Sequence, residues 1–166
     1  MKWTSKQLVT MAMFIALSAL MSFIKIPGPV GSIAMDSTPA FLGALLFGPV
    51  FGGIVGFFGH VASAATAGFQ LGLPTHLVIA FMMFLTLYLV GLLKDKLHAF
   101  VVLAIGVAIN GVGAPLALVP LQLLPMAVAT GIIPLLTTVS FANAILGYSL
   151  YLALRTNPVV KRIYEA

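Results

Sequence analysis

The residues of this sequence that could bind a small molecule are polar side chains set within long apolar stretches. The set comprises four amides, two imidazoles and one carboxylate: Asp36, His60, Gln70, His76, Asn110, Gln122 and Asn143. Such groups are costly in apolar surroundings, so they tend to face a cavity or one another. Four phenylalanines are expected nearby, namely Phe41, Phe58, Phe69 and Phe141. Because amides donate and accept hydrogen bonds and aromatic rings supply contact area, the set suits a neutral, partly aromatic molecule.

Each candidate also has a purely structural explanation. Asp36 could cap a helix that begins in the segment Asp-Ser-Thr-Pro. His60 could bond a neighbouring backbone carbonyl, and His76 could lie at the membrane interface as a helix-start residue. Asn110 and Asn143 could hold helices together. Gln70 is the strongest candidate for contacting a ligand, because it lies in a glycine-flanked loop that is not needed for helix packing.

The sequence lacks the motifs of most enzymes. It contains no cysteine, and no glycine is followed by lysine, so a phosphate-binding loop for ATP hydrolysis is absent. It has no H-E-x-x-H motif, and a serine–histidine dyad based on Ser63 or Ser140 lacks a nucleophile elbow. The remaining catalytic hypothesis is an intramembrane enzyme that uses His60, His76 and Asp36. We predict no catalytic residue, metal site or cofactor.

Composition indicates a membrane protein. The chain has 166 residues, of which 61% are hydrophobic and only 7% are charged, and its mean hydropathy is +1.19. A soluble domain carries roughly 25% charged residues, so a soluble enzyme is excluded. The net charge of +5 comes from basic residues at loops and termini, which favours topology signals beside a bilayer over a nucleic-acid partner.

Glycine and proline divide the apolar sequence into an all-α bundle of six transmembrane helices in one domain, residues 1–166. The expected spans are residues 8–24, 39–47, a third from 51, 76–93, 99–119 and 137–154. Thr38 is the expected N-cap of the second helix, with Pro39 at its first position. Loops are expected at Pro27, Gly28, Pro29 and Gly31, and again at residues 67–74. Residues 119–136 contain three prolines and are expected to be irregular or re-entrant.

Basic residues give the orientation in the cell membrane. Clusters precede the first span, separate the fourth from the fifth, and follow the sixth, and with six spans all three lie on one side. The positive-inside rule then places both termini in the cytoplasm, with Lys25 on the outer side.

Small residues recur four positions apart in several helices, which allows close helix contact in lipid. The rows are Ala12 and Ala16; Ala40, Ala44 and Gly48; Gly52, Gly56, His60 and Ala64; and Gly106, Asn110 and Ala114. Most of these rows are expected to pack inside the bundle. The alanine pair of the first helix is the exception, since a partner helix could use it.

These features resemble the substrate-binding S component of an energy-coupling factor (ECF) vitamin transporter. The resemblance rests on Ala12-x-x-x-Ala16, on the segment PAFLGALLFGP at residues 39–49 with the glycines that follow it, and on outer loops over a pocket. It implies that the chain binds a micronutrient from outside. It also implies docking, through Ala12 and Ala16, on a transmembrane coupling subunit that works with two cytoplasmic ATPases.

The segment AATAGFQLGLPTH at residues 64–76 is similar to variants linked to salvage of α-ribazole, the nucleoside of the cobalamin lower ligand. A neutral benzimidazole riboside would fit amides, imidazoles and phenylalanine. The absence of arginine from the pocket region argues against a strongly anionic vitamin such as folate, although Lys25 could serve one carboxylate. Riboflavin and a pyrimidine precursor stay open as alternatives.

Overall fold

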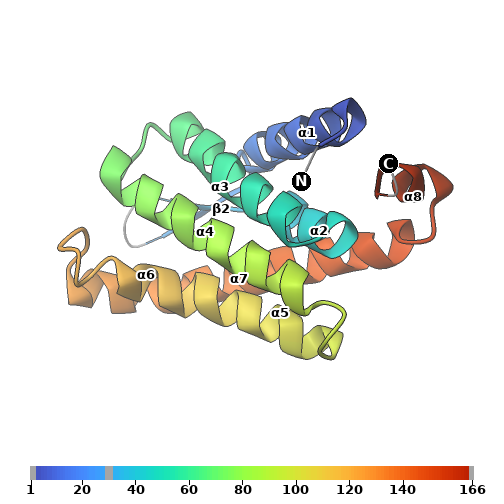
Figure 1. The fold of residues 1–166 in the computed structure, drawn as a ribbon. Coiled ribbons are helices and arrows are strands. Elements are labelled where there is room, and N and C mark those ends of the chain that lie inside the picture. Colours follow the sequence, from blue (N-terminus) through green and yellow to red (C-terminus); the bar gives the residue numbers. More distant parts are fainter. Residues whose placement is uncertain (1–2, 29–31, 165–166) are drawn as a thin grey trace.

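The computed structural model describes residues 3–28 and 32–164, and helices account for most of them (Figure 1). The longer helices are α1 (Ser5–Met21), α2 (Thr38–Phe47), α3 (Pro49–Thr66), α4 (Leu73–Leu93), α5 (Ala99–Ala108) and α7 (Met126–Leu154). The shorter ones are the π-helical segment η1 (Ile109–Gly113), α6 (Ala114–Ala117) and α8 (Pro158–Tyr164). Two strands, β1 (Lys25–Pro27) and β2 (Ser32–Ala34), complete the fold.

The first expected loop is flanked by two short strands that pair as an antiparallel hairpin, which the sequence did not predict in the otherwise helical fold. Strand β1 pairs with β2, with Ile26 opposite Ile33 and Pro27 opposite Ser32. The β-branched isoleucines favour extended backbone, and the apolar–turn–apolar pattern allows the pairing. Pro29 and Gly31, which were assigned to the same loop, lie outside the described residues.

Helix α2 is short and almost wholly buried, because neighbouring helices surround it. The helix begins at Thr38 and its N-cap is Ser37, one residue earlier than predicted, with no capping bond from the Ser37 side chain. Asn143 of α7 supplies the missing acceptor: its Oδ1 lies 2.9 Å from the Thr38 backbone nitrogen and 2.7 Å from Thr38 Oγ1. A side chain distant in sequence therefore holds the start of α2.

Small residues let the central helices approach closely. A Cβ atom at Gly91 would lie 2.6 Å from the backbone of Pro49, and one at Gly147 would lie 2.8 Å from Phe41 Cβ. Gly56 similarly faces the backbone of Met83. Of the glycines in the predicted rows, Gly52, Gly56 and Gly106 thus pack against neighbouring helices, whereas Ala12 and Ala16 are exposed on α1. Gly48, with φ of 93°, makes the sharp break between α2 and α3.

The C-terminal span is longer than predicted. Helix α7 begins at Met126, not at residue 137, and continues through Pro134. The proline-rich stretch therefore contains only a turn at residues 118–125 before this helix. One proline removes a single backbone hydrogen bond, whereas an unfolded segment in apolar surroundings would leave many backbone groups unsatisfied. The expectation of an irregular or re-entrant segment over residues 119–136 is wrong beyond that turn.

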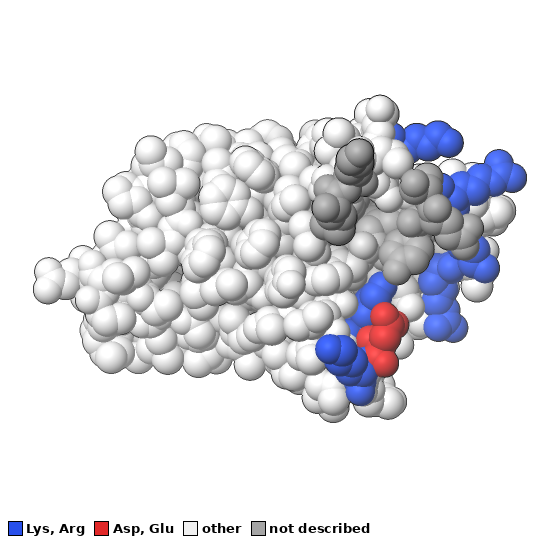
Figure 2. Space-filling view, viewed as in Figure 1, with Lys and Arg blue, Asp and Glu red and all other residues white. Residues whose placement is uncertain are grey.

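Within the described residues, four helices are long and apolar enough to cross a membrane: Pro49–Thr66, Leu73–Leu93, Ala99–Ala117 and Met126–Leu154. Ser5–Met21 and Thr38–Phe47 are shorter apolar helices. The count of six spans stays a prediction. In Figure 2 the lysines and arginines on the visible face gather at one end of the molecule, and the other end is uncharged on that face.

Candidate binding cavity

A cavity of about 140 Å³ lies at the end of the bundle that contains the hairpin. Its wall is built from the hairpin, the C-terminal half of α3, the start of α4, the segment from η1 to α6, and the middle of α7. Six of the seven predicted binding residues line it: Asp36, His60, Gln70, His76, Asn110 and Asn143. The helices thus bring together side chains that lie more than a hundred positions apart in sequence.

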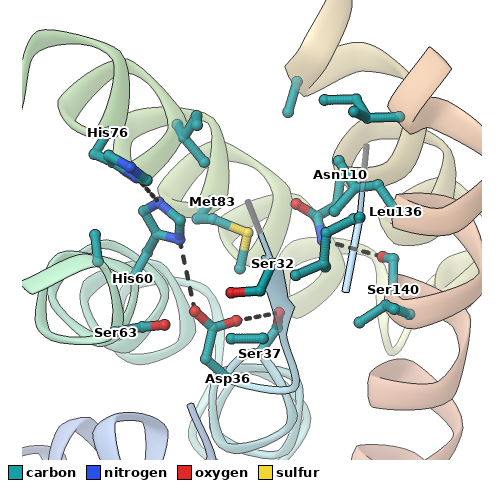
Figure 3. Close-up of a pocket in the computed structure, with 18 of the residues that line it drawn as sticks. Ser32, Asp36, Ser37, His60, Ser63, His76, Met83, Asn110, Leu136 and Ser140 are labelled. Carbon is teal, nitrogen blue, oxygen red and sulfur yellow. Dashed lines mark hydrogen bonds and ion pairs between the residues drawn. The ribbon is translucent and has the colours of Figure 1, made fainter. Parts of the chain in front are cut away.

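One wall carries a chain of three titratable groups (Figure 3). Asp36 Oδ2 lies 3.6 Å from His60 Nδ1, and His60 Nε2 lies 3.3 Å from His76 Nδ1. The residues come from the β2–α2 connection, α3 and α4, respectively. Ser37 Oγ donates to the second carboxylate oxygen of Asp36 at 3.1 Å. The carboxylate is therefore fixed from both sides.

A backbone contact at the His76 end of this row of three side chains determines which imidazole nitrogen atoms carry hydrogen. The backbone N–H of Leu71 donates to His76 Nε2 at 3.4 Å, so this nitrogen is an acceptor. A neutral His76 then has its hydrogen on Nδ1 and donates to His60 Nε2. His60 in turn has its hydrogen on Nδ1, which faces Asp36. The donors therefore all point toward the carboxylate.

Asp36 is buried, and burial by itself would raise the pKa of its carboxyl. The hydrogen bond and the charge interaction with His60, together with the hydrogen bonds from the Ser63 and Ser37 hydroxyls, outweigh burial and hold the pKa of Asp36 below its usual value. Because the charged form has these donors, Asp36 is an anionic acceptor beside the cavity.

The opposite side of the cavity offers an amide and an apolar surface. Asn110 lies in η1, and its Nδ2 donates to Ser140 Oγ at 3.1 Å, which leaves its Oδ1 on the cavity side in Figure 3. The apolar side chains on this side come from the α3–α4 loop, α4, α6, α7 and the α6–α7 connection, and they are Leu71, Ile79, Met83, Ala114, Pro115, Leu118, Ile132, Leu136 and Val139. Smaller apolar contributions come from Ile33 and Ala34 of β2 and from Ala64 and Ala67 at the end of α3. The cavity therefore has one polar wall and one apolar wall.

Two of the lining amides also have structural roles. Asn143 bonds Thr38 and donates from Nδ2 to the Val139 carbonyl at 3.0 Å, as expected of a residue that holds helices together. Gln70 Oε1 accepts from the Ser32 backbone N–H at 3.3 Å. This bond joins the α3–α4 loop to strand β2, so two outer segments close over the cavity as one unit.

Comparison with known proteins agrees with this architecture. The sequence model of the family described as "ECF transporter, substrate-specific component" matches residues 6–161. This chain belongs to that family. A solved structure described as that of the S component of a bacterial ECF transporter shares the fold, with a TM-score of 0.65 and 24% identity over 90% of this chain and 95% of the other. No curated protein matches the chain.

Membership confirms the resemblance noted from the sequence. The S component is a multi-pass membrane protein and the substrate-binding subunit of a transporter, not an enzyme. The hypothesis of an intramembrane enzyme based on His60, His76 and Asp36 is therefore wrong. In the described part of the chain, no three His, Asp or Glu side chains are grouped so that they could hold a metal ion.

Some sequence expectations do not match the cavity of this S component. Gln122 is exposed in the turn before α7, with φ of 57°, and lies outside the cavity lining. Phe41 is in the core, Phe58 and Phe141 are exposed, and Phe69 packs edge-on against the His76 ring. No Phe, Tyr or Trp is among the described residues that line the cavity.

Sequence reasoning also missed part of the lining. Ile79 and Met83 were not selected, although they follow His76 by three and seven positions and so share its helix face. Ser140 precedes Asn143 by three positions and Ser63 follows His60 by three, so helical spacing places each serine beside a candidate. Counting along each helix from the candidate residues at helical spacing would have identified all four of these lining residues.

Proposed function

We propose that this S component binds a neutral, nucleoside-like vitamin precursor, and that α-ribazole is the best candidate. The observation that carries the proposal is the division of the cavity into a hydrogen-bonding wall around Asp36 and an apolar wall around Met83. A nucleoside has the matching division, because its sugar is rich in hydroxyls and its base is flat and largely apolar.

The polar wall favours hydroxyl groups. The Asp36 carboxylate already accepts from Ser37 and has further lone pairs to accept from a ligand. The hydroxyl of Ser63 and the ring of His60 lie beside it. A hydroxyl that donates to the carboxylate forms a charge-assisted hydrogen bond, which is roughly twice as strong as a neutral one.

The apolar wall favours an aromatic base without negative charge. Ile79, Met83 and Leu136 provide surface for a ring system, and methionine adapts to aromatic faces. Asn110 Oδ1 offers one acceptor at the cavity edge. The described lining contains no arginine, and its one lysine, Lys25, is at the hairpin. An anionic vitamin would find little charge compensation beside Asp36.

The loop that resembles α-ribazole variants takes part in this cavity. Within residues 64–76, the side chains that line it are Ala64, Ala67, Gln70, Leu71 and His76. The segment that carries the substrate resemblance is thus the segment that would contact the substrate, which favours α-ribazole over riboflavin or a pyrimidine precursor.

Energy for uptake would come from partner proteins. The proposed partners are a transmembrane coupling subunit and two cytoplasmic ATPases, with Ala12 and Ala16 as the docking pair. Both alanines are exposed on α1, and small exposed residues allow a partner helix to approach closely in lipid. We further propose six spans with both termini in the cytoplasm, in which α1 and α2 are the two short spans.

A thermal-stability panel on the detergent-purified protein tests the substrate. Binding to the folded state raises the unfolding temperature in proportion to the logarithm of ligand excess. We expect α-ribazole to give a larger shift than its free base, ribose, riboflavin or folate. Gln122→Ala serves as the control and should retain the shift. A larger shift with riboflavin or a pyrimidine would reassign the substrate, and no shift with any neutral heterocycle would contradict the proposal.

A further inference from the structure

The amide of Asn110 and the hydroxyl of Ser140 form a buried pair in the lining of the substrate cavity. Asn110 is 6% exposed and Ser140 is 1% exposed. Figure 3 shows the pair on the side of the cavity away from His60. Asn110 is also the only polar side chain in residues 99–117. The pair is therefore the polar group that this long apolar stretch offers to a ligand.

The π-helical turn of η1 sets the position of Asn110. Pro115 has no N–H, so it cannot donate to the carbonyl of Gly111 at α-helical spacing, and a regular α-helix cannot continue here. The N–H of Ala114 donates instead to the carbonyl of Ile109, five residues earlier. Single π-helical turns within α-helices are frequent at functional sites. The irregular turn thus has a cause in the sequence, and it carries the amide that faces the cavity.

The glycine next to Asn110 brings helix α7 close to this turn. A Cβ atom at Gly111 would lie 2.6 Å from Thr137 Oγ1, so a larger residue at this position would push α7 away. Ser140 follows Thr137 by three positions and lies on the same face of α7. The close approach at Gly111 therefore holds the Ser140 hydroxyl within hydrogen-bond distance of Asn110, at 3.1 Å.

The pair can present either a donor or an acceptor to the cavity. Among the described residues, Asn110 Nδ2 is the one hydrogen-bond partner of Ser140 Oγ. The hydroxyl accepts in this bond, so within the described part of the chain its own hydrogen has no acceptor and Asn110 Oδ1 has no donor. A hydroxyl can also donate. When the amide turns over, Ser140 donates to Oδ1, Nδ2 faces the cavity, and the two side chains stay bonded.

We propose that Asn110, held by Ser140, selects ligands whose base has a ring nitrogen with a free lone pair, to which the turned amide donates. This inference rests on the function proposed above: α-ribazole has one such nitrogen, because the other nitrogen of its benzimidazole is attached to the sugar. Of the other lining amides, Asn143 already donates from Nδ2 to the Val139 carbonyl, and Gln70 bonds the hairpin. Asn110 therefore determines specificity for the base, and Ser140 is a positioning residue.

The test compares two ligands of the same shape by isothermal titration of the full-length protein in detergent. One is α-ribazole, and the other is its indole analogue, in which a C–H group replaces the free ring nitrogen. The wild type should bind α-ribazole roughly 2- to 13-fold more tightly, which is the contribution of one neutral hydrogen bond. Asn110→Ala should bind the two ligands equally, and Ser140→Ala should show a reduced preference because the amide loses its support.

Ser149→Ala is the matched control for the serine variant. Ser149 is exposed on α7, donates to the Ile145 carbonyl and lies outside the cavity lining, so its variant should keep the wild-type preference. Because each variant is compared across two ligands, a general loss of stability does not imitate the result.

The outcomes separate this inference from the proposed function. Equal affinity of the wild type for the two ligands, or an unchanged preference in Asn110→Ala, overturns the inference and leaves the proposed function in place. An unchanged preference in Ser140→Ala overturns the role of the pair. If the wild type binds neither ligand, the inference and the α-ribazole proposal both fall. Where Asn110→Ala does not fold, the wild-type comparison and Ser140→Ala still decide.

Discussion

The two ends of this S component differ in how their charged groups are placed. At the hairpin end one buried carboxylate, Asp36, interacts favourably with His60, Ser63 and Ser37, so its charged form is stabilised before any ligand enters. At the other end, the lysines and arginines on the visible face gather at the surface (Figure 2). The difference is consistent with a substrate cavity that takes neutral hydroxylated molecules and with a basic end that carries the topology signals of a membrane protein.

The largest effect is expected when the negative charge of Asp36 in the substrate cavity is removed. Asp36→Asn keeps the shape but converts an acceptor of charge-assisted bonds into an amide. Hydrogen bonds to charged groups contribute about 1.5–3 kcal/mol, so the affinity for α-ribazole should fall by roughly 10- to 150-fold. Isothermal titration of the purified protein measures this change. Arg155→Gln, at the exposed end of α7 and outside the substrate cavity, should leave this affinity unchanged, and equal losses in the two variants would contradict the role of Asp36 in binding.

A smaller effect on binding but a clear effect on stability is expected at Asn143. Asn143→Ala leaves the buried Thr38 N–H without its acceptor and leaves the Thr38 hydroxyl only the backbone carbonyl of residue 143, at 3.5 Å. An unsatisfied buried group costs about 1–3 kcal/mol. The unfolding temperature in detergent should drop by several degrees, about 2–4 °C per kcal/mol for a chain of this size.

The matched control for that experiment is Asn157→Ala. Asn157 Oδ1 accepts the exposed Val159 N–H at the start of α8. Its removal should cost less, because water can replace an exposed bond. If the two variants lose the same stability, Asn143 does not hold the start of α2 as described.

A moderate loss is expected when the two outer segments are uncoupled. Gln70→Ala removes the bond from the α3–α4 loop to Ser32 on β2. One neutral hydrogen bond contributes about 0.5–1.5 kcal/mol, so the affinity should fall by roughly 2- to 13-fold, mainly through faster dissociation. Stopped-flow measurement with α-ribazole separates the two rates. A changed association rate with unchanged dissociation would contradict the role of this bond in closure.

The smallest effect is expected at Gln122, which the sequence placed in the binding set and the structure places in an exposed turn. Gln122→Ala should leave both α-ribazole affinity and stability within about 0.5 kcal/mol of the wild type. Loss of affinity in this variant would show that the turn before α7 closes over the bound substrate.

Local sequence signals predicted most of the helices but not the contacts between distant segments. Apolar length and glycine–proline punctuation located the breaks around Gly48 and Gly72, where the backbone has positive φ. The same rules misjudged Pro134, because one lost hydrogen bond is outweighed by the rest of a long apolar helix. The hairpin was missed because its pairing depends on two isoleucines seven positions apart.

The sequence predicted which polar residues form the candidate site, but it did not predict how these residues are arranged and bonded to one another. Polar side chains in an apolar chain are few, so their convergence could be anticipated. The direction of the Asp36–His60–His76 chain depends on the Leu71 backbone N–H, which no residue type reveals. The apolar wall could not be predicted either. From the sequence alone, Met83 and Leu136 cannot be distinguished from apolar residues that face lipid, and only the packing of the helices shows that they line the cavity.

Hydrogen–deuterium exchange with and without saturating α-ribazole tests the central claim most directly. The account predicts that the ligand protects the backbone amides of β2 and of residues 67–72, which line or close the substrate cavity. Residues 94–99, in the turn between α4 and α5 and outside the substrate cavity, should exchange at the same rate in both samples. Protection of that turn alone, or no protection of the outer segments at saturation, would contradict the account.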